Sequence, residues 1–135
     1  MTPNDIPVSS VIPATVPKKC RELFEKLAQV VPEEQLEELR EAMRRHLQTA
    51  ERHLGPAPLN LQLIGRMTTA LDTALNAYGS LSETQRALLV GAIRYFVENE
   101  DAANDLDDPF GFDDDLAVIN AVLFEIGLRQ LVVTR

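Results

Sequence analysis

The segment "SETQRALLVGAIRYFV", residues 82–97, combines a helix start signal with apolar residues on almost every helical face. Ser82 followed by Gln85 three residues later is a capping box, in which each side chain satisfies the other residue's backbone N–H group. A helix that is hydrophobic all round lies in the middle of a bundle or at an interface with another chain. The segment therefore predicts a central helix that other helices cover.

A second segment of this kind follows Asp113 and is expected to be helical as far as Leu131. Three amphipathic helices are expected before residue 82, because apolar residues recur at steps of three and four. They cover residues 18–31, 33–54 and 60–78, with these inward residues: Cys20, Leu23, Phe24, Leu27, Val31; Leu36, Leu39, Met43, Leu47, Ala50, Leu54; Ile64, Met67, Leu71, Leu75, Tyr78. The sequence predicts an all-α fold, a compact bundle of about five helices forming a single domain over residues 18–135.

Residues 1–17 contain four prolines, a density that prevents a helix. We expect an extended proline-rich arm. Apolar β-branched residues lie between the prolines, so two alternatives stay open: a disordered tail, or an arm that docks along the domain or onto a second copy.

Three glycines, Gly65, Gly91 and Gly127, lie inside the expected helices. Glycine costs about 1 kcal/mol relative to alanine in a helix interior, so each position calls for a reason. Close crossings between helices are the expected reason at all three.

Composition limits the function classes. Cys20 is the single cysteine, so the chain forms no internal disulfide and cannot build a zinc site from thiolates. We expect Cys20 to be a buried, inert thiol. With no apolar stretch that resembles a leader peptide or a membrane span, the expected location is cytoplasmic, without a transmembrane segment.

The net charge of −8 is concentrated in residues 98–115, which hold nine acidic residues and no basic one, while the rest of the chain is close to neutral. Such a chain offers no basic surface for phosphates, so no nucleic-acid partner is expected. The basic band of the second helix (Arg40, Arg44, Arg45, His46) is expected to be a solvated face paired with its own acids, for example Glu41 with Arg45. His46 and His53 are expected at the surface.

The acidic segment has a structural interpretation. Asp113 is expected to cap the last helix, and Asp114 and Asp115 are expected in its first turn, where the positive end of the helix dipole favours carboxylates. Pro109 and Gly111 are typical of a turn. On this interpretation the acids connect two buried helices.

A sharper hypothesis assigns a metal site to the same segment. Asp101 and Asp105, one helical turn apart, could converge with Asp114 or Asp115 on Mg²⁺ or Ca²⁺, which prefer oxygen ligands. The EF-hand pattern is absent, because Phe110 stands where that loop requires glycine. The expected cofactor is therefore none, with the divalent cation as the alternative.

Residues 92–117 resemble the YkvA-like family, a bacterial group of small helical domains of unknown function. The matching residues, on one ungapped spacing, are Ala92, Tyr95, Asp101, Asp105, Gly111, Phe112, Asp114, Asp115, Leu116 and Ala117. The resemblance implies a helical fold more firmly than a role. Some relatives associate with membranes, so peripheral membrane association is a further, weaker alternative.

No nucleophile and base, phosphate-binding glycine loop or nucleophile elbow is found in the sequence, so no catalytic residue is assigned. We expect a non-enzymatic protein-interaction or regulatory module with a protein partner. The apolar helices and the arm favour self-association as a homo-oligomer.

Overall fold

The computed structural model describes residues 12–53, 58–98 and 113–134. These residues form five α-helices and three short 3₁₀ helices, and no strand occurs among them, which confirms the all-α expectation. The elements in chain order are α1 (Lys18–Leu27), η3 (Glu33–Gln35), α2 (Leu36–His53), α3 (Pro58–Leu75), η4 (Tyr78–Ser80), α4 (Glu83–Glu98), α6 (Asp113–Glu125) and η5 (Arg129–Leu131).

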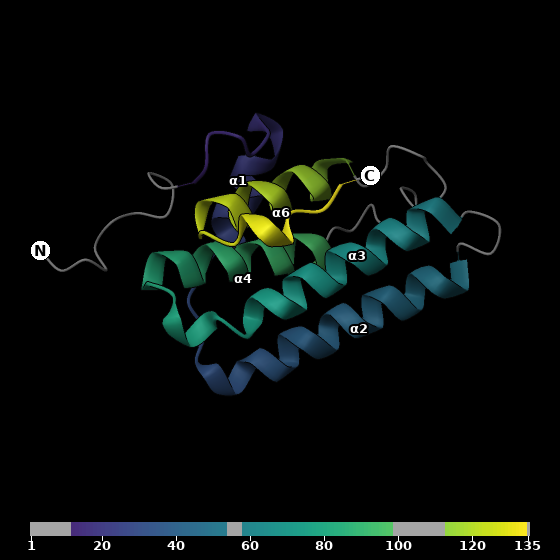
Figure 1. Cartoon of the computed structure of the whole chain (residues 1–135), viewed down its shortest axis with the longest axis horizontal. Helices are drawn as coiled ribbons and strands as arrows, with labels where there is room; N and C mark the ends of the chain where they lie inside the picture. The colour runs from purple at the N-terminus through teal and green to yellow at the C-terminus, as the bar shows by residue number, and fades with distance from the viewer. Residues whose placement is uncertain (1–11, 54–57, 99–112, 135) are drawn as a thin grey trace, which may run out of the picture.

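Helix α4 is the centre of the bundle, as its all-round apolar pattern predicts. It packs against α1, α2, α3 and α6, and Figure 1 shows it between the α2–α3 pair and the α1–α6 pair. Its apolar surface is therefore covered within one chain. The largest fully buried side chains come from α4 and from the elements around it: Phe24, Met43, Ile64, Met67, Leu71, Leu75, Tyr78, Leu88, Leu89 and Phe96.

The start of α4 is the capping box that the sequence indicates. The backbone N–H of Ser82 donates to Oε1 of Gln85 at 2.9 Å, and the backbone N–H of Gln85 donates to Oγ of Ser82 at 3.1 Å. Two backbone donors at the helix start are thereby satisfied.

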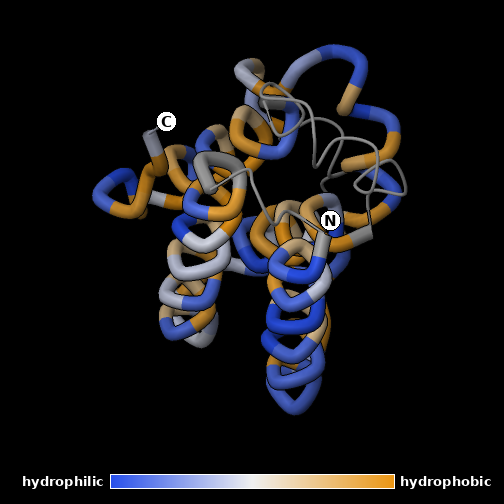
Figure 2. The backbone as a smooth tube through the Cα atoms, turned by 90° about the vertical axis from the view of Figure 1, so that its right-hand side faces the viewer, coloured by the Kyte–Doolittle hydropathy of each residue, from blue (hydrophilic) through white to orange (hydrophobic). Residues whose placement is uncertain are grey.

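Helices α2 and α3 form an antiparallel pair on one side of α4 (Figure 1). The apolar seam of α2 faces inward, with Leu39, Met43 and Ala50 buried. In Figure 2 most residues of α2 have the colour of hydrophilic residues. An outer covering helix with a narrow apolar stripe is the arrangement that the spacing predicts.

Helix α1 ends at Leu27, earlier than the expected end before Pro32. Leu23, expected to point inward, is 43% exposed, whereas Cys20 and Phe24 are buried. Beyond the helix, the hydroxyl group of Tyr78 holds Val31: it accepts a hydrogen bond from the Val31 N–H at 3.1 Å and donates one to the Val31 carbonyl at 2.6 Å. This pair of bonds fixes a non-helical link where the apolar spacing suggested more helix.

Part of the proline-rich arm is described. A turn closes between Pro13 and Val16, whose N–H donates to the Pro13 carbonyl at 3.0 Å, and Ile12 and Val16 are buried in the core. Arg21 donates to the carbonyl groups of Ile12 and Pro13. Residues 12–16 thus dock on the domain, and residues 1–11 of the expected extended arm lie outside the described residues.

Helix α6 is shorter than expected. It ends at Glu125, and Gly127 follows with φ +82°, a left-handed conformation that glycine adopts without steric cost. The expected helix as far as Leu131 is therefore wrong, and so is the placement of Gly127 inside a helix. The chain continues through η5 into residues 132–134, which run back along the domain (Figure 1).

Candidate functional site

The acidic segment is described only at its C-terminal end. Asp101, Asp105, Pro109 and Gly111 lie outside the described residues, and of Asp113 only the backbone is described, as the first residue of α6. The expected turn, the Asp113 side-chain cap and the first two ligands of the cation hypothesis therefore stay predictions.

Asp114 and Asp115 have different surroundings. Asp114 forms an ion pair with Lys19 of α1, with Oδ2 and Nζ 3.2 Å apart, and both side chains are well exposed to solvent. Asp115 is 2% exposed, the single charged residue among the buried residues of the described chain. The expectation of a carboxylate in the first turn fits both, but the burial of Asp115 has no signal in the sequence.

Cys20 and Tyr95 meet beside the start of α6. The Tyr95 hydroxyl group donates a hydrogen bond to Sγ of Cys20, with the two atoms 3.1 Å apart, and both side chains are buried. Burial raises the pKa of the Cys20 thiol above its ordinary value, and it also raises the pKa of the Tyr95 phenol. A thiol held in its protonated form is a poor nucleophile, which supports the prediction of an inert cysteine.

No group of three or more histidine, cysteine, aspartate or glutamate side chains within residues 12–53, 58–98 and 113–134 is placed to hold a metal ion. Within those same ranges, no helix is long and apolar enough to cross a bilayer.

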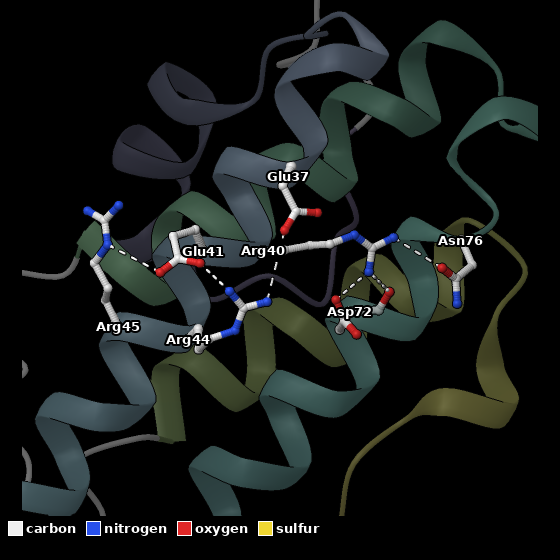
Figure 3. A network of polar contacts seen from close by, with 7 residues as sticks. All are labelled: Glu37, Arg40, Glu41, Arg44, Arg45, Asp72 and Asn76. Atoms are coloured by element: carbon white, nitrogen blue, oxygen red, sulfur yellow. Dashed lines mark hydrogen bonds and ion pairs between the residues drawn. The ribbon is translucent and has the colours of Figure 1, made fainter.

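Arg44 and Arg45 of the basic band are paired with acids of their own helix, as predicted. Arg44 forms ion pairs with Glu37 and Glu41, and Nε of Arg45 lies 3.8 Å from Oε1 of Glu41 (Figure 3). These pairs join residues three, four or seven positions apart on one helix face, so the band is largely neutralised by its own helix.

Arg40 differs from its neighbours because it joins two helices. It forms an ion pair with the Asp72 side chain and donates to the Asp72 carbonyl and to Oδ1 of Asn76, each at 3.1 Å (Figure 3). Since Asp72 is on α3 and Asn76 directly follows that helix, Arg40 fastens α2 to α3 along their outer edge.

His46 is half-buried, contrary to the expectation of a surface position. Its ring packs edge-on against Phe96 of α4, with the ring centroids 4.7 Å apart. Nε2 is buried, and no described residue gives it a hydrogen-bond partner. Burial lowers the pKa of the imidazole below 6.5.

This environment predicts a pH dependence of stability. Because the folded-state pKa of His46 lies below its unfolded value of 6.5, the unfolded state binds more protons as the pH falls below 6.5, and folding stability decreases there. We expect the midpoint temperature of thermal unfolding to decrease less between pH 8 and pH 5 for His46→Leu than for the wild type. Parallel curves for the two proteins would contradict the assignment to His46.

A groove of about 1030 Å³ lies between α3 and the C-terminal segment. One face of α3 forms its floor: Gln62, Gly65, Arg66, Thr69, Ala70 and Thr73. Residues 130–134 form one wall, and Leu47 of α2 adds an apolar group. Figure 2 shows the C-terminal segment beside α3 and away from α2. The groove is therefore a candidate binding site.

Asn120 holds the wall of this groove in place. Its Nδ2 donates to the Val133 carbonyl and its Oδ1 accepts from the Val133 N–H, both at 2.8 Å. The side chain of Val133 is buried beneath. These two hydrogen bonds hold residues 130–134 on the domain, although most of this segment is neither helix nor strand.

We expect Asn120→Ala to destabilise the protein by about 1–2 kcal/mol, because two hydrogen bonds are lost and the backbone groups of Val133 lose their partners. Hydrogen exchange should accelerate at residues 129–134, with the amides of α4 as the internal reference. Equal acceleration throughout the chain would show that Asn120 has no local role in holding the segment.

Sequence reasoning missed this groove. Of the groove wall, Gln130 and Leu131 were expected to be part of a helix, and the polar residues of α3 were assigned no role from the sequence. The sequence contains one signal, which is the glycine at position 65 in a helix interior. In the structure a Cβ atom at Gly65 would meet nothing within 4 Å, so a close helix crossing does not explain this glycine. That expectation was wrong because Gly65 faces the open groove.

The chain was compared with protein-family models, curated proteins and solved structures, and no match was found in any of the three. The resemblance of residues 92–117 to the YkvA-like family therefore stays a prediction. The functional interpretation depends on the groove and on its chemistry.

Proposed function

We propose that the protein is a non-enzymatic protein-interaction module that binds its partner in the groove between α3 and residues 130–134. The observation that carries the proposal is the groove itself, about 1030 Å³ in volume, in which apolar side chains alternate with amides and hydroxyl groups. Binding sites in proteins are concave and largely apolar, with a few polar groups that fix the orientation of the ligand.

Self-association is one form of this function. The apolar faces of α4 are covered by the other helices, so a second copy would have to use other apolar side chains. Exposed ones are present near the chain's C-terminus: Phe124 is 57% exposed, under the guanidinium of Arg129, and Val132 of the groove wall is 37% exposed. Isolated exposed apolar residues are ordinary, so the groove is the stronger feature.

The test is site-specific photo-crosslinking in cells that natively express the full chain. A photoreactive residue at Thr69, in the groove, should capture a discrete partner, whereas one at Thr49, exposed on α2 and outside the groove, should not. The Gly65→Leu variant should abolish the capture, because its side chain enters the open space above α3.

Light scattering of the purified protein identifies a partner that is a second copy, since the mass then doubles. Capture that is equal at Thr69 and Thr49, or that persists in Gly65→Leu, would overturn the proposal.

A further inference from the structure

A positive charge lies among the described residues that line the groove. Arg66 is the one charged residue among the described groove residues, and no described carboxylate lies within ion-pair distance of it. By contrast, Arg40, Arg44 and Arg45 are all paired with acids. In a chain of net charge −8, an arginine without a carboxylate partner among the described residues of the groove is complementary to an acidic group on the occupant.

A guanidinium group suits a carboxylate in particular. Its N–H groups form a planar fork that donates two parallel hydrogen bonds to the two oxygens of one carboxylate. A groove wall of apolar side chains lowers the local dielectric and strengthens such a pair relative to one in open solvent.

The polar groups around Arg66 favour a peptide over an aliphatic chain. Gln62 and Gln130 each offer an amide donor and acceptor, and the hydroxyl groups of Thr69 and Thr73 line the floor between. The Thr69 hydroxyl donates to the Gly65 carbonyl at 3.0 Å, which leaves its oxygen free to accept. An aliphatic chain would cover these groups without replacing their hydrogen bonds to water, whereas a peptide backbone provides both donors and acceptors.

The dimensions set the length of the occupant. From Gln62 to Thr73 the floor extends for about 16 Å, at about 1.5 Å per helical residue. An extended peptide covers that length with about five residues, at about 3.3 Å each.

We propose that the groove recognises a short extended peptide segment of a partner protein, apolar in character, with one aspartate or glutamate that pairs with Arg66. The proposal rests on the proposed function, because it specifies the chemistry of the partner that the groove binds. The apolar residues of the peptide contact Leu47, Ala70 and Leu131, and its carboxylate fixes the register.

Selection from a displayed library of randomised peptides of about seven residues tests the proposal, with the full-length protein as bait and Gly65→Leu for counter-selection. Peptides that survive should share one acidic position flanked by apolar residues. The best peptide should bind about tenfold more weakly when its acid is changed to the matching amide. Arg66→Gln should remove that tenfold difference, and Arg52→Gln, at an exposed arginine of α2 outside the groove, should retain it.

Each outcome decides between the two proposals. Selected peptides that share no acidic position would overturn the recognition of a carboxylate. A tenfold effect of the acid that persists in Arg66→Gln would overturn it as well. In both cases the groove remains a binding site. If no peptide is enriched and decanoate competes with the crosslinking at Thr69, the occupant of the groove is an aliphatic acid and not a peptide. Failure of both the selection and the Thr69 crosslink would overturn the proposed function as well.

Discussion

Gly91→Ala is expected to destabilise the folded protein by about 2–3 kcal/mol. A Cβ atom at this position of α4 would lie 2.8 Å from Cβ of Ala28, 2.8 Å from Cε2 of Phe24 and 3.0 Å from Cα of Ala28. Gly91 and Phe24 are both buried, and one of the three close atoms belongs to the backbone of Ala28, so movement of the Phe24 ring alone cannot relieve the clash. Relief requires that α1 and α4, which pack directly on each other, move apart.

The matched control is the same substitution at Gly65, in the middle of α3. A Cβ atom there meets nothing within 4 Å, so alanine should stabilise the protein by about 0.5–1 kcal/mol through its better helix propensity. Urea unfolding measures the free energy of unfolding of both variants. The slope of that free energy against urea concentration should stay unchanged in each. Changes of the same sign in the two variants would contradict the close approach of α1 and α4 at Gly91.

The architecture could be predicted from local signals. The reciprocal bonds of Ser82 and Gln85 depend on residues three positions apart, and the apolar pattern of α4 identifies it as the central helix. The predicted pairing of Glu41 with Arg45 is confirmed for the same reason, because both residues are on one helix face. Signals of this kind are contained within one or two helical turns, so the sequence displays them directly.

Helix ends and the candidate site could not be predicted because they depend on distant residues. The apolar spacing continues past Leu27 and past Glu125, but Tyr78 and Asn120 bind the backbone of Val31 and Val133 in non-helical conformations.

The groove has the same origin. Its floor is on α3, and its wall is more than 50 residues further along the chain. In the sequence Arg66 looks like any other surface cation, because the residues of the groove wall are distant from it along the chain. The burial of Nε2 of His46 likewise depends on Phe96, a residue of another helix.

Tyr78→Phe is expected to destabilise the protein by about 2–4 kcal/mol. The Tyr78 hydroxyl is the partner of both backbone polar groups of Val31, and both residues are buried. Removal of one oxygen atom therefore leaves a buried donor and a buried acceptor unsatisfied, each at a cost of about 1–3 kcal/mol. Chemical denaturation should show the loss, and hydrogen exchange should accelerate first at residues 28–32.

Tyr95→Phe is the control, because it also removes one buried phenol oxygen. That hydroxyl donates to the sulfur of Cys20, a weak acceptor, and no backbone group loses a partner when it is removed. The expected loss is about 1 kcal/mol or less. Similar losses in the two variants would mean that burial of the phenol dominates and that the link between α1 and α2 is held by its apolar contacts. A larger loss for Tyr78→Phe would show that one side chain, 47 positions along the chain from Val31, determines where the first helix gives way to the second.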